Sequence, residues 1–226
     1  VVSDEGLAPG ESGEELIKML GRLEYDITVR DILELDSSNI QPEEWKIIAE
    51  AIYDHRNEYD GIVVSHGTDT MAYTASMLTF MLQHINIPVV LTGSQVPMNV
   101  ILSDAPDNLR LAFAAAANCE PGVYIAFNRK VIRGCRSVKV RTTAFDAFES
   151  VNVPPVGEVT SDGFSIRDHR HPQPGKSQLN TKIDTHVSLV KLFPGFAPAL
   201  LHAMAKNGCH GIVIEAYGLG GMTSIR

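Results

Sequence analysis

The chain has 226 residues, of which 44% are hydrophobic and 20% are charged. This is the composition of an ordinary globular protein, and it excludes the disordered, collagen-like and coiled-coil classes. The 19 basic residues against 27 acidic ones give a formal net charge of −8, which would repel the phosphates of a nucleic acid. We therefore expect no nucleic-acid partner.

Cysteine usage and hydropathy narrow the class further. Cys119, Cys135 and Cys209 lie far apart without a C-x-x-C spacing, so neither a disulfide framework nor a zinc knuckle is indicated, and a reducing compartment is favoured. No apolar run approaches the ~18 residues that a membrane span needs. We expect no membrane partner.

The first elements are predicted by local signals in the chain. Ser12 and Glu15 form a capping box in front of an apolar stretch, which predicts a short helix ending near Gly21. Residues 27–35 are rich in β-branched side chains and predict a strand. Pro42 then opens an amphipathic helix.

A regular alternation follows. Buried strands are predicted at 61–64, 87–91 and 122–127, and helices at 70–82 and from 103 to about 117. Continuous apolar strands separated by helices are typical of a parallel sheet that is covered on both faces. The fold class is therefore predicted to be α/β.

The pattern weakens after residue 160 and then resumes. A second β-α-β unit is predicted from a strand at 187–193, a helix at 197–206 and a strand at 211–216. Three elements cannot bury a sheet on both faces, so we expect this domain to be incomplete. The predicted organisation is an N-terminal catalytic α/β domain at 1–160, a linker at 161–184, and the start of a smaller C-terminal α/β domain at 185–226.

In an open parallel sheet, ligands bind beyond the carboxyl ends of the strands. Loops at 36–39, 65–70 and 92–95 follow predicted strands and carry small hydroxyl, amide or acidic side chains. Each loop taken singly is equally well explained as helix caps and turns. Three such loops at one edge of a sheet favour a binding site.

The middle loop has the clearest chemistry. Gly67 lets the backbone approach a ligand, while Thr68 and Asp69 present a hydroxyl and a carboxylate beside free helix N–H groups. Such a turn can stabilise an oxyanion or bind a carboxylate, and Asp69 can accept an ammonium group. The alternative is that Asp69 is only a helix cap.

Residues 133–141 contain four cationic side chains. One interpretation is a solvated basic face; the other is that Lys139 lies buried and acts as a base toward a hydroxyl. The spacing does not decide between them.

Residues 60–75 closely resemble the second signature of the bacterial-type L-asparaginases. Similar motifs of that family are found at Asp36–Ser38, Leu91–Pro97, Phe145–Phe148 and Phe193–Gly195. The resemblance extends over the chain from about residue 16, and its details look most like the cytosolic type I branch.

This resemblance implies hydrolysis of L-asparagine to L-aspartate and ammonia by a threonine mechanism, without metal or cofactor. The implied catalytic residues are Thr68, Asp69 and Lys139, with Lys139 activating the Thr68 hydroxyl and Asp69 holding the substrate ammonium group. The Thr68 N–H would help to form an oxyanion hole. The implied substrate-binding residues are Asp36, Ser37, Ser38, Gly67 and Ser94.

The resemblance also carries expectations about the whole protein. It implies a cytoplasmic homodimer or homotetramer. The family's first signature, a T-G-G-T loop on the first strand, does not occur in the chain, so we expect it to precede Val1. We likewise expect the C-terminal domain to continue beyond Gly221.

Two other functions stay open. The glutamine-hydrolysing subunit of a tRNA-dependent amidotransferase shares the His-Gly-Thr-Asp-Thr loop, although the Asp36–Ser38 loop looks less like that branch. The chain could instead be a non-catalytic amino-acid-binding fragment, which would bind a ligand without releasing ammonia.

Overall fold

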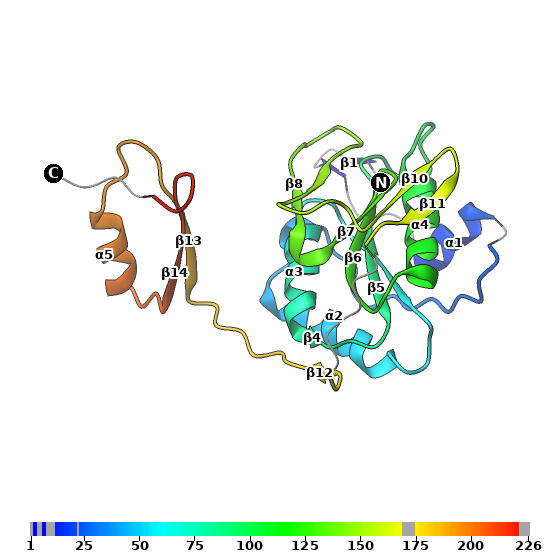
Figure 1. Cartoon of the computed structure of the whole chain (residues 1–226), viewed down its shortest axis with the longest axis horizontal. Coiled ribbons are helices and arrows are strands. Elements are labelled where there is room, and N and C mark those ends of the chain that lie inside the picture. Colours follow the sequence, from blue (N-terminus) through cyan, green and yellow to red (C-terminus); the bar gives the residue numbers. More distant parts are fainter. Residues whose placement is uncertain (1, 4–5, 8–11, 22, 169–174, 222–226) are drawn as a thin grey trace. The chain divides into compact units, whose positions relative to one another are not determined.

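The computed structural model describes residues 2–3, 6–7, 12–21, 23–168 and 175–221 (Figure 1). The chain divides into two compact units, an N-terminal unit of residues 1–181 and a C-terminal unit of residues 182–226. In the described residues, no helix is both long enough and apolar enough to cross a membrane.

The N-terminal unit is built on a six-stranded sheet with the order β11-β10-β7-β6-β5-β3. Three neighbouring strands are parallel: β3 (Ile62–Ser65), β5 (Pro88–Thr92) and β6 (Gly122–Phe127). Three antiparallel strands extend the sheet: β7 (Lys130–Arg133), β10 (Gly157–Thr160) and β11 (Gly163–Ile166). The α/β class is confirmed, and the antiparallel extension is an addition to the predicted parallel sheet.

Helices cover both faces of this sheet. Figure 1 shows α2 (Pro42–His55) and α3 (Met71–Met81) on one side, and α1 (Gly13–Leu20) and α4 (Ala105–Asn118) on the other. The predicted capping box at Ser12 is confirmed. α3 packs between α2 and the sheet and buries most of its surface, while Tyr73 and Phe80 stay exposed.

The core lies where α3 and α4 cover the parallel strands. Val89, Val90 and Leu91 of β5 and Ile125 of β6 are fully buried. Each such side chain contributes about 1.5–3 kcal/mol by leaving water. This packing makes the strand ends a rigid base for the loops that follow them.

The strand predicted at residues 27–35 is wrong, since the structure places these residues in no helix or strand. A strand is defined by hydrogen bonds to a neighbouring strand. None of the described strands pairs with this segment. A β-rich composition therefore did not suffice to form one.

Much of the segment predicted as a linker, 161–184, belongs to the N-terminal unit. β11 lies in the main sheet, and β12 (Gln178–Leu179) pairs with β4 (Leu82–Gln83). The Tyr53 hydroxyl also donates to the Ser177 carbonyl at 3.1 Å. Backbone pairing needs no apolar side chains, so a polar sequence can join a sheet. Residues 169–174 lie outside the described part.

The C-terminal unit contains the predicted β-α-β elements. They are β13 (Val187–Lys191), α5 (Ala199–Lys206) and β14 (Gly211–Glu215). The two strands are parallel, and Val187 is opposite Gly211. Residues 222–226 lie outside the described part of this unit.

Candidate active site

The register of the parallel strands brings two of the predicted loops to the same edge of the sheet. Ser65, the last residue of β3, is opposite Thr92, the last residue of β5. The His66 amide continues the pairing by donating to the Thr92 carbonyl at 2.8 Å. The loops that carry Thr68 and Ser94 therefore leave the sheet side by side, as predicted.

The loop at 36–39, the first of the three, packs against the loop at 65–70. Asp36 caps the 3-10 turn η1 (Ser37–Asn39) by accepting from the Ser38 amide at 2.8 Å. The Thr70 hydroxyl donates to the Ser37 carbonyl at 2.7 Å. A Cβ atom at Gly67 would lie 2.5 Å from the Ser37 Oγ, so only glycine allows this close approach.

Three side chains meet in front of α3. Lys139 Nζ donates to Thr68 Oγ1 at 2.9 Å and forms an ion pair with Asp69 Oδ1 at 2.6 Å. The Lys139 side chain is only 15% exposed, whereas the Asp69 side chain is 63% exposed. The sequence separates these residues by about 70 positions, and the fold brings them together.

Lys139 is positioned by its own strand. It ends β8 (Ser137–Lys139), where it is opposite Phe148 of β9 (Phe148–Ser150). The buried Phe148 ring packs edge-on against Phe127, with ring centroids 4.9 Å apart. The turn η2 (Gly134–Arg136) before β8 lies against α3. β8 thus begins beside α3, and its last side chain reaches the loop in front of that helix.

Gln95 is a further site residue that the sequence reasoning did not assign. Thr68 Oγ1 donates to Gln95 Oε1 at 3.2 Å, while the side-chain nitrogen Nε2 of Gln95 donates to the Thr142 and Ala144 carbonyls at 2.8 and 3.0 Å. These two carbonyls fix which end of the amide faces Thr68. The signal in the sequence was its place directly after Ser94, in the third loop.

The Gln95 backbone is held by a carboxylate. Asp104 accepts from the Gln95 and Val96 amides, each at 3.0 Å, and from Asn108 Nδ2 at 2.9 Å. Asn108 is buried at the start of α4 and also donates to the Gly93 carbonyl at 2.9 Å. The loop after β5 is therefore fixed at both ends to α4.

His66 is held by hydrogen bonds within its own loop and to α3. Its Nδ1 lies 2.6 Å from the Gly67 carbonyl, and its Nε2 lies 2.8 Å from the hydroxyl oxygen of Thr74, which accepts from Trp45 Nε1 at 2.9 Å. A carbonyl can only accept, so Nδ1 carries the proton. Burial lowers the pKa of His66, although its bond to the Gly67 carbonyl opposes that shift. The neutral ring holds the loop onto α3.

The basic segment is not a uniform solvated face. Arg133 pairs with Asp168 at 2.9 Å, and Arg141 pairs with Glu149 at 2.9 Å. Lys139 is directed instead at Thr68 and Asp69. The geometry therefore favours the functional interpretation of Lys139.

The arrangement can support chemistry on an electrophilic carbon. Thr68 presents a hydroxyl, and the nearby ammonium of Lys139 can stabilise negative charge that develops on that oxygen. The exposed Asp69 carboxylate can receive a cationic group of a ligand. Cys119 does not compete as a nucleophile, because burial raises its pKa to about 11 and keeps the thiol protonated.

Comparison with known proteins agrees with the family resemblance of the sequence. A family model described as "Asparaginase, N-terminal" matches residues 1–172. The L-asparaginase of Thermococcus kodakarensis is 41% identical over 97% of this chain and 68% of its own length. L-asparaginase 1 of Escherichia coli K12 is 39% identical over 86% of this chain and 59% of its own length.

A solved structure matches equally well. The thermostable L-asparaginase from Thermococcus kodakarensis superimposes with a TM-score of 0.90 at 40% identity, over 99% of this chain and 69% of that one. A glutamyl-tRNA(Gln) amidotransferase component of Methanopyrus kandleri is similar at the lower identity of 36%, over 94% of this chain and 51% of its own length. The chain thus spans 59–69% of the length of the L-asparaginases named above. By its matched family model, its sequence and its fold, the chain belongs to the asparaginase family.

Proposed function

We propose that the chain forms the asparagine-hydrolysing site of an L-asparaginase, which converts L-asparagine and water to L-aspartate and ammonia. The observation that carries this proposal is the placement of Lys139 Nζ between Thr68 Oγ1 and Asp69 Oδ1. Membership of the asparaginase family supplies the reaction class.

In the proposed mechanism, Lys139 and Asp69 act on the hydroxyl and on the substrate. Lys139 activates Thr68 and stabilises negative charge on its oxygen. The exposed carboxylate of Asp69 pairs with the α-ammonium group of the substrate. The Thr68 amide, in front of α3, contributes to an oxyanion hole for the tetrahedral intermediate.

The neighbouring loops would bind the rest of the substrate. Asp36, Ser37 and Ser38 surround the α-amino and α-carboxylate groups, Gly67 allows the close approach of the backbone, and Ser94 meets the side-chain amide. The contacts of Ser37 with Gly67 and Thr70 support this role, because they hold the first loop against the second. Hydroxyl, ammonium and carboxylate groups supply the chemistry, and we propose no metal or cofactor for it.

We also propose that the protein is cytoplasmic and self-associates as a homodimer or homotetramer. Three free cysteines support a reducing compartment. Tyr73 and Phe80 lie on α3, about two helical turns apart, and both are exposed aromatic side chains. Such a stripe supports contact with another chain. Analytical ultracentrifugation would measure the number of subunits.

The amidotransferase alternative has less support. The matching amidotransferase component is similar at lower identity than the asparaginases, and the net charge of −8 disfavours tRNA binding. An amino-acid-binding fragment without catalysis would show ligand binding with no ammonia release.

The test is ammonia release from L-asparagine, compared with L-glutamine, by the whole gene product and by the 226-residue chain in parallel. We expect asparagine to be the better substrate. Activity of the 226-residue chain would assign the nucleophile to Thr68, and activity confined to the gene product would assign it to a threonine outside the chain. Binding of asparagine without ammonia release in either protein would overturn the proposal.

A further inference from the structure

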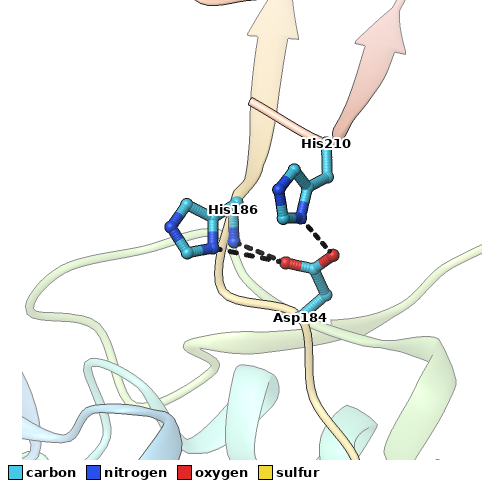
Figure 2. A group of neighbouring side chains, drawn as sticks. All are labelled: Asp184, His186 and His210. Atoms are coloured by element: carbon cyan, nitrogen blue, oxygen red, sulfur yellow. Dashed lines mark hydrogen bonds and ion pairs between the residues drawn. The ribbon is translucent and has the colours of Figure 1, made fainter. Parts of the chain in front are cut away.

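Three side chains of the C-terminal unit converge at the amino-terminal edge of its strand pair. Val187 and Gly211 are opposite each other at the start of β13 and β14. His186 and His210 directly precede them, and the His210 amide donates to the His186 carbonyl at 2.7 Å. Asp184 lies two residues before His186. The parallel register therefore places two imidazoles beside one carboxylate, as Figure 2 shows.

The distances within this cluster are short. His210 Nδ1 lies 2.8 Å from Asp184 Oδ2, and His186 Nδ1 lies 3.5 Å from Asp184 Oδ1. One ligand atom from each residue can be chosen so that all three lie within 4.8 Å of one another. Ligand atoms of a tetrahedral zinc site are about 3.3 Å apart, given bond lengths of about 2.0–2.1 Å. Small side-chain rotations would bring the three atoms to that spacing.

The backbone already orients the carboxylate. The His186 amide donates to Asp184 Oδ1 at 2.9 Å. This bond, followed by the bond to the His210 ring, lowers the pKa of Asp184, so the carboxylate is ionised. The side chains of Asp184, His186 and His210 are 49%, 63% and 61% exposed, which leaves them accessible to an ion from solution.

The ligand types define which ion fits. Two imidazoles and one carboxylate suit Zn²⁺ and the neighbouring transition metals, whereas Ca²⁺ and Mg²⁺ prefer oxygen ligands alone. Cys209 lies next in sequence to His210 but its thiol is directed to the Gly211 carbonyl at 3.0 Å, away from this ligand set. Three protein ligands leave at least one position for water.

The geometry points to a transition-metal site, best suited to Zn²⁺, formed by Asp184, His186 and His210 on the C-terminal unit. The ion takes the place of the proton between His210 Nδ1 and Asp184, and His210 then carries its ring proton on Nε2. Because the ligands come from the starts of both strands, a bound ion links β13 to β14. This site is separate from the residues proposed for asparagine hydrolysis.

The test is a calorimetric titration of the metal-free full chain with Zn²⁺ alone and, separately, with Mg²⁺. We expect one Zn²⁺ to bind with an affinity that falls about tenfold or more in each of Asp184→Asn, His186→Asn and His210→Asn, since even outer-shell partners are worth on the order of 10–100-fold. Mg²⁺ should bind far more weakly. Nitrogen NMR should show both Nδ1 resonances shifting with Zn²⁺.

Two control variants make the result decisive. His202→Asn removes another exposed histidine, on α5 of the same unit, and should leave the affinity unchanged. A His169→Asn, His171→Asn double variant removes the other closely spaced histidines of the chain. Unchanged Zn²⁺ affinity in His210→Asn, or a loss that follows the double variant instead, would overturn the proposal. Circular dichroism would show that the variants stay folded.

Discussion

The two units place their polar clusters in opposite environments. In the N-terminal unit, Thr68 and Gln95 lie in loops that follow β3 and β5, and Lys139 ends β8; these elements pack around a buried core. In the described residues of the C-terminal unit, Val190 alone is a buried apolar side chain, and α5 buries none. The Asp184, His186 and His210 cluster is exposed and depends on strand register and on its own hydrogen bonds.

This difference shows two ways in which a sheet can position polar side chains. At the carboxyl ends of β3 and β5, the loops are fixed to α4 by Asp104 and to α3 by His66. Their geometry therefore depends on the packing of the whole unit. At the amino ends of β13 and β14, the pairing of two neighbouring backbone positions suffices to bring the polar side chains together. We expect the first cluster to be sensitive to substitution of many residues and the second only to substitution of its own members.

The largest effect is expected for Lys139→Met. It removes the only group shown to contact both Thr68 and Asp69 among the described bonds, so kcat for ammonia release should fall on the order of 10²–10⁴-fold. Lys206→Met changes an exposed lysine of the C-terminal unit and should keep full activity. Full activity in Lys139→Met would contradict the site assignment.

Truncating an apolar side chain should destabilise the N-terminal unit far more than the C-terminal unit. Leu78→Ala in the fully buried side of α3 should lower the free energy of unfolding by about 2–5 kcal/mol. Leu189→Ala in β13, where the side chain is 66% exposed, should cost about 0.5 kcal/mol or less. Urea denaturation of both variants measures the contrast, and equal losses would remove the distinction between the units.

The two units should also differ in the cost of removing a carboxylate. Asp104→Ala leaves the part-buried amides of Gln95 and Val96 without their acceptor, at a cost of about 1–3 kcal/mol. Asp184→Ala frees groups that water can reach and should cost less in metal-free buffer. Thermal unfolding with a chelator present measures both, and Asp104→Asn, which keeps one acceptor oxygen, should recover part of the loss.

The smallest effect expected is a pH dependence from His66. Its pKa is lowered by burial, so the unfolded chain binds a proton more readily than the folded one. Stability should therefore be greatest above about pH 6.5, the ordinary histidine value, and decline as the pH falls toward the lowered pKa of the folded state. Urea titrations at several pH values should show this slope reduced in His66→Gln and retained in His202→Asn. An unreduced slope in His66→Gln would show that another group titrates.

Much of the fold could be predicted because it depends on local patterns. The capping box at Ser12, the apolar run of β6 at Gly122–Phe127 and the β-α-β elements after residue 187 each follow from side chains near in sequence. The antiparallel strands β7, β10 and β11 were not predicted, since their pairing joins segments that do not show a strong apolar pattern. The failure at 27–35 has the same origin, because a strand requires a partner.

The site divides in the same way. The candidate residues and the family could be predicted from the sequence, because Thr68, Asp69 and the motifs around them are short and specific. Three contacts became visible only in the folded chain: Lys139 faces Thr68, Gln95 accepts from the Thr68 hydroxyl, and His186 and His210 share one carboxylate. Contacts between residues far apart in sequence are set by strand register and helix packing, and neither is written in any single segment of the chain.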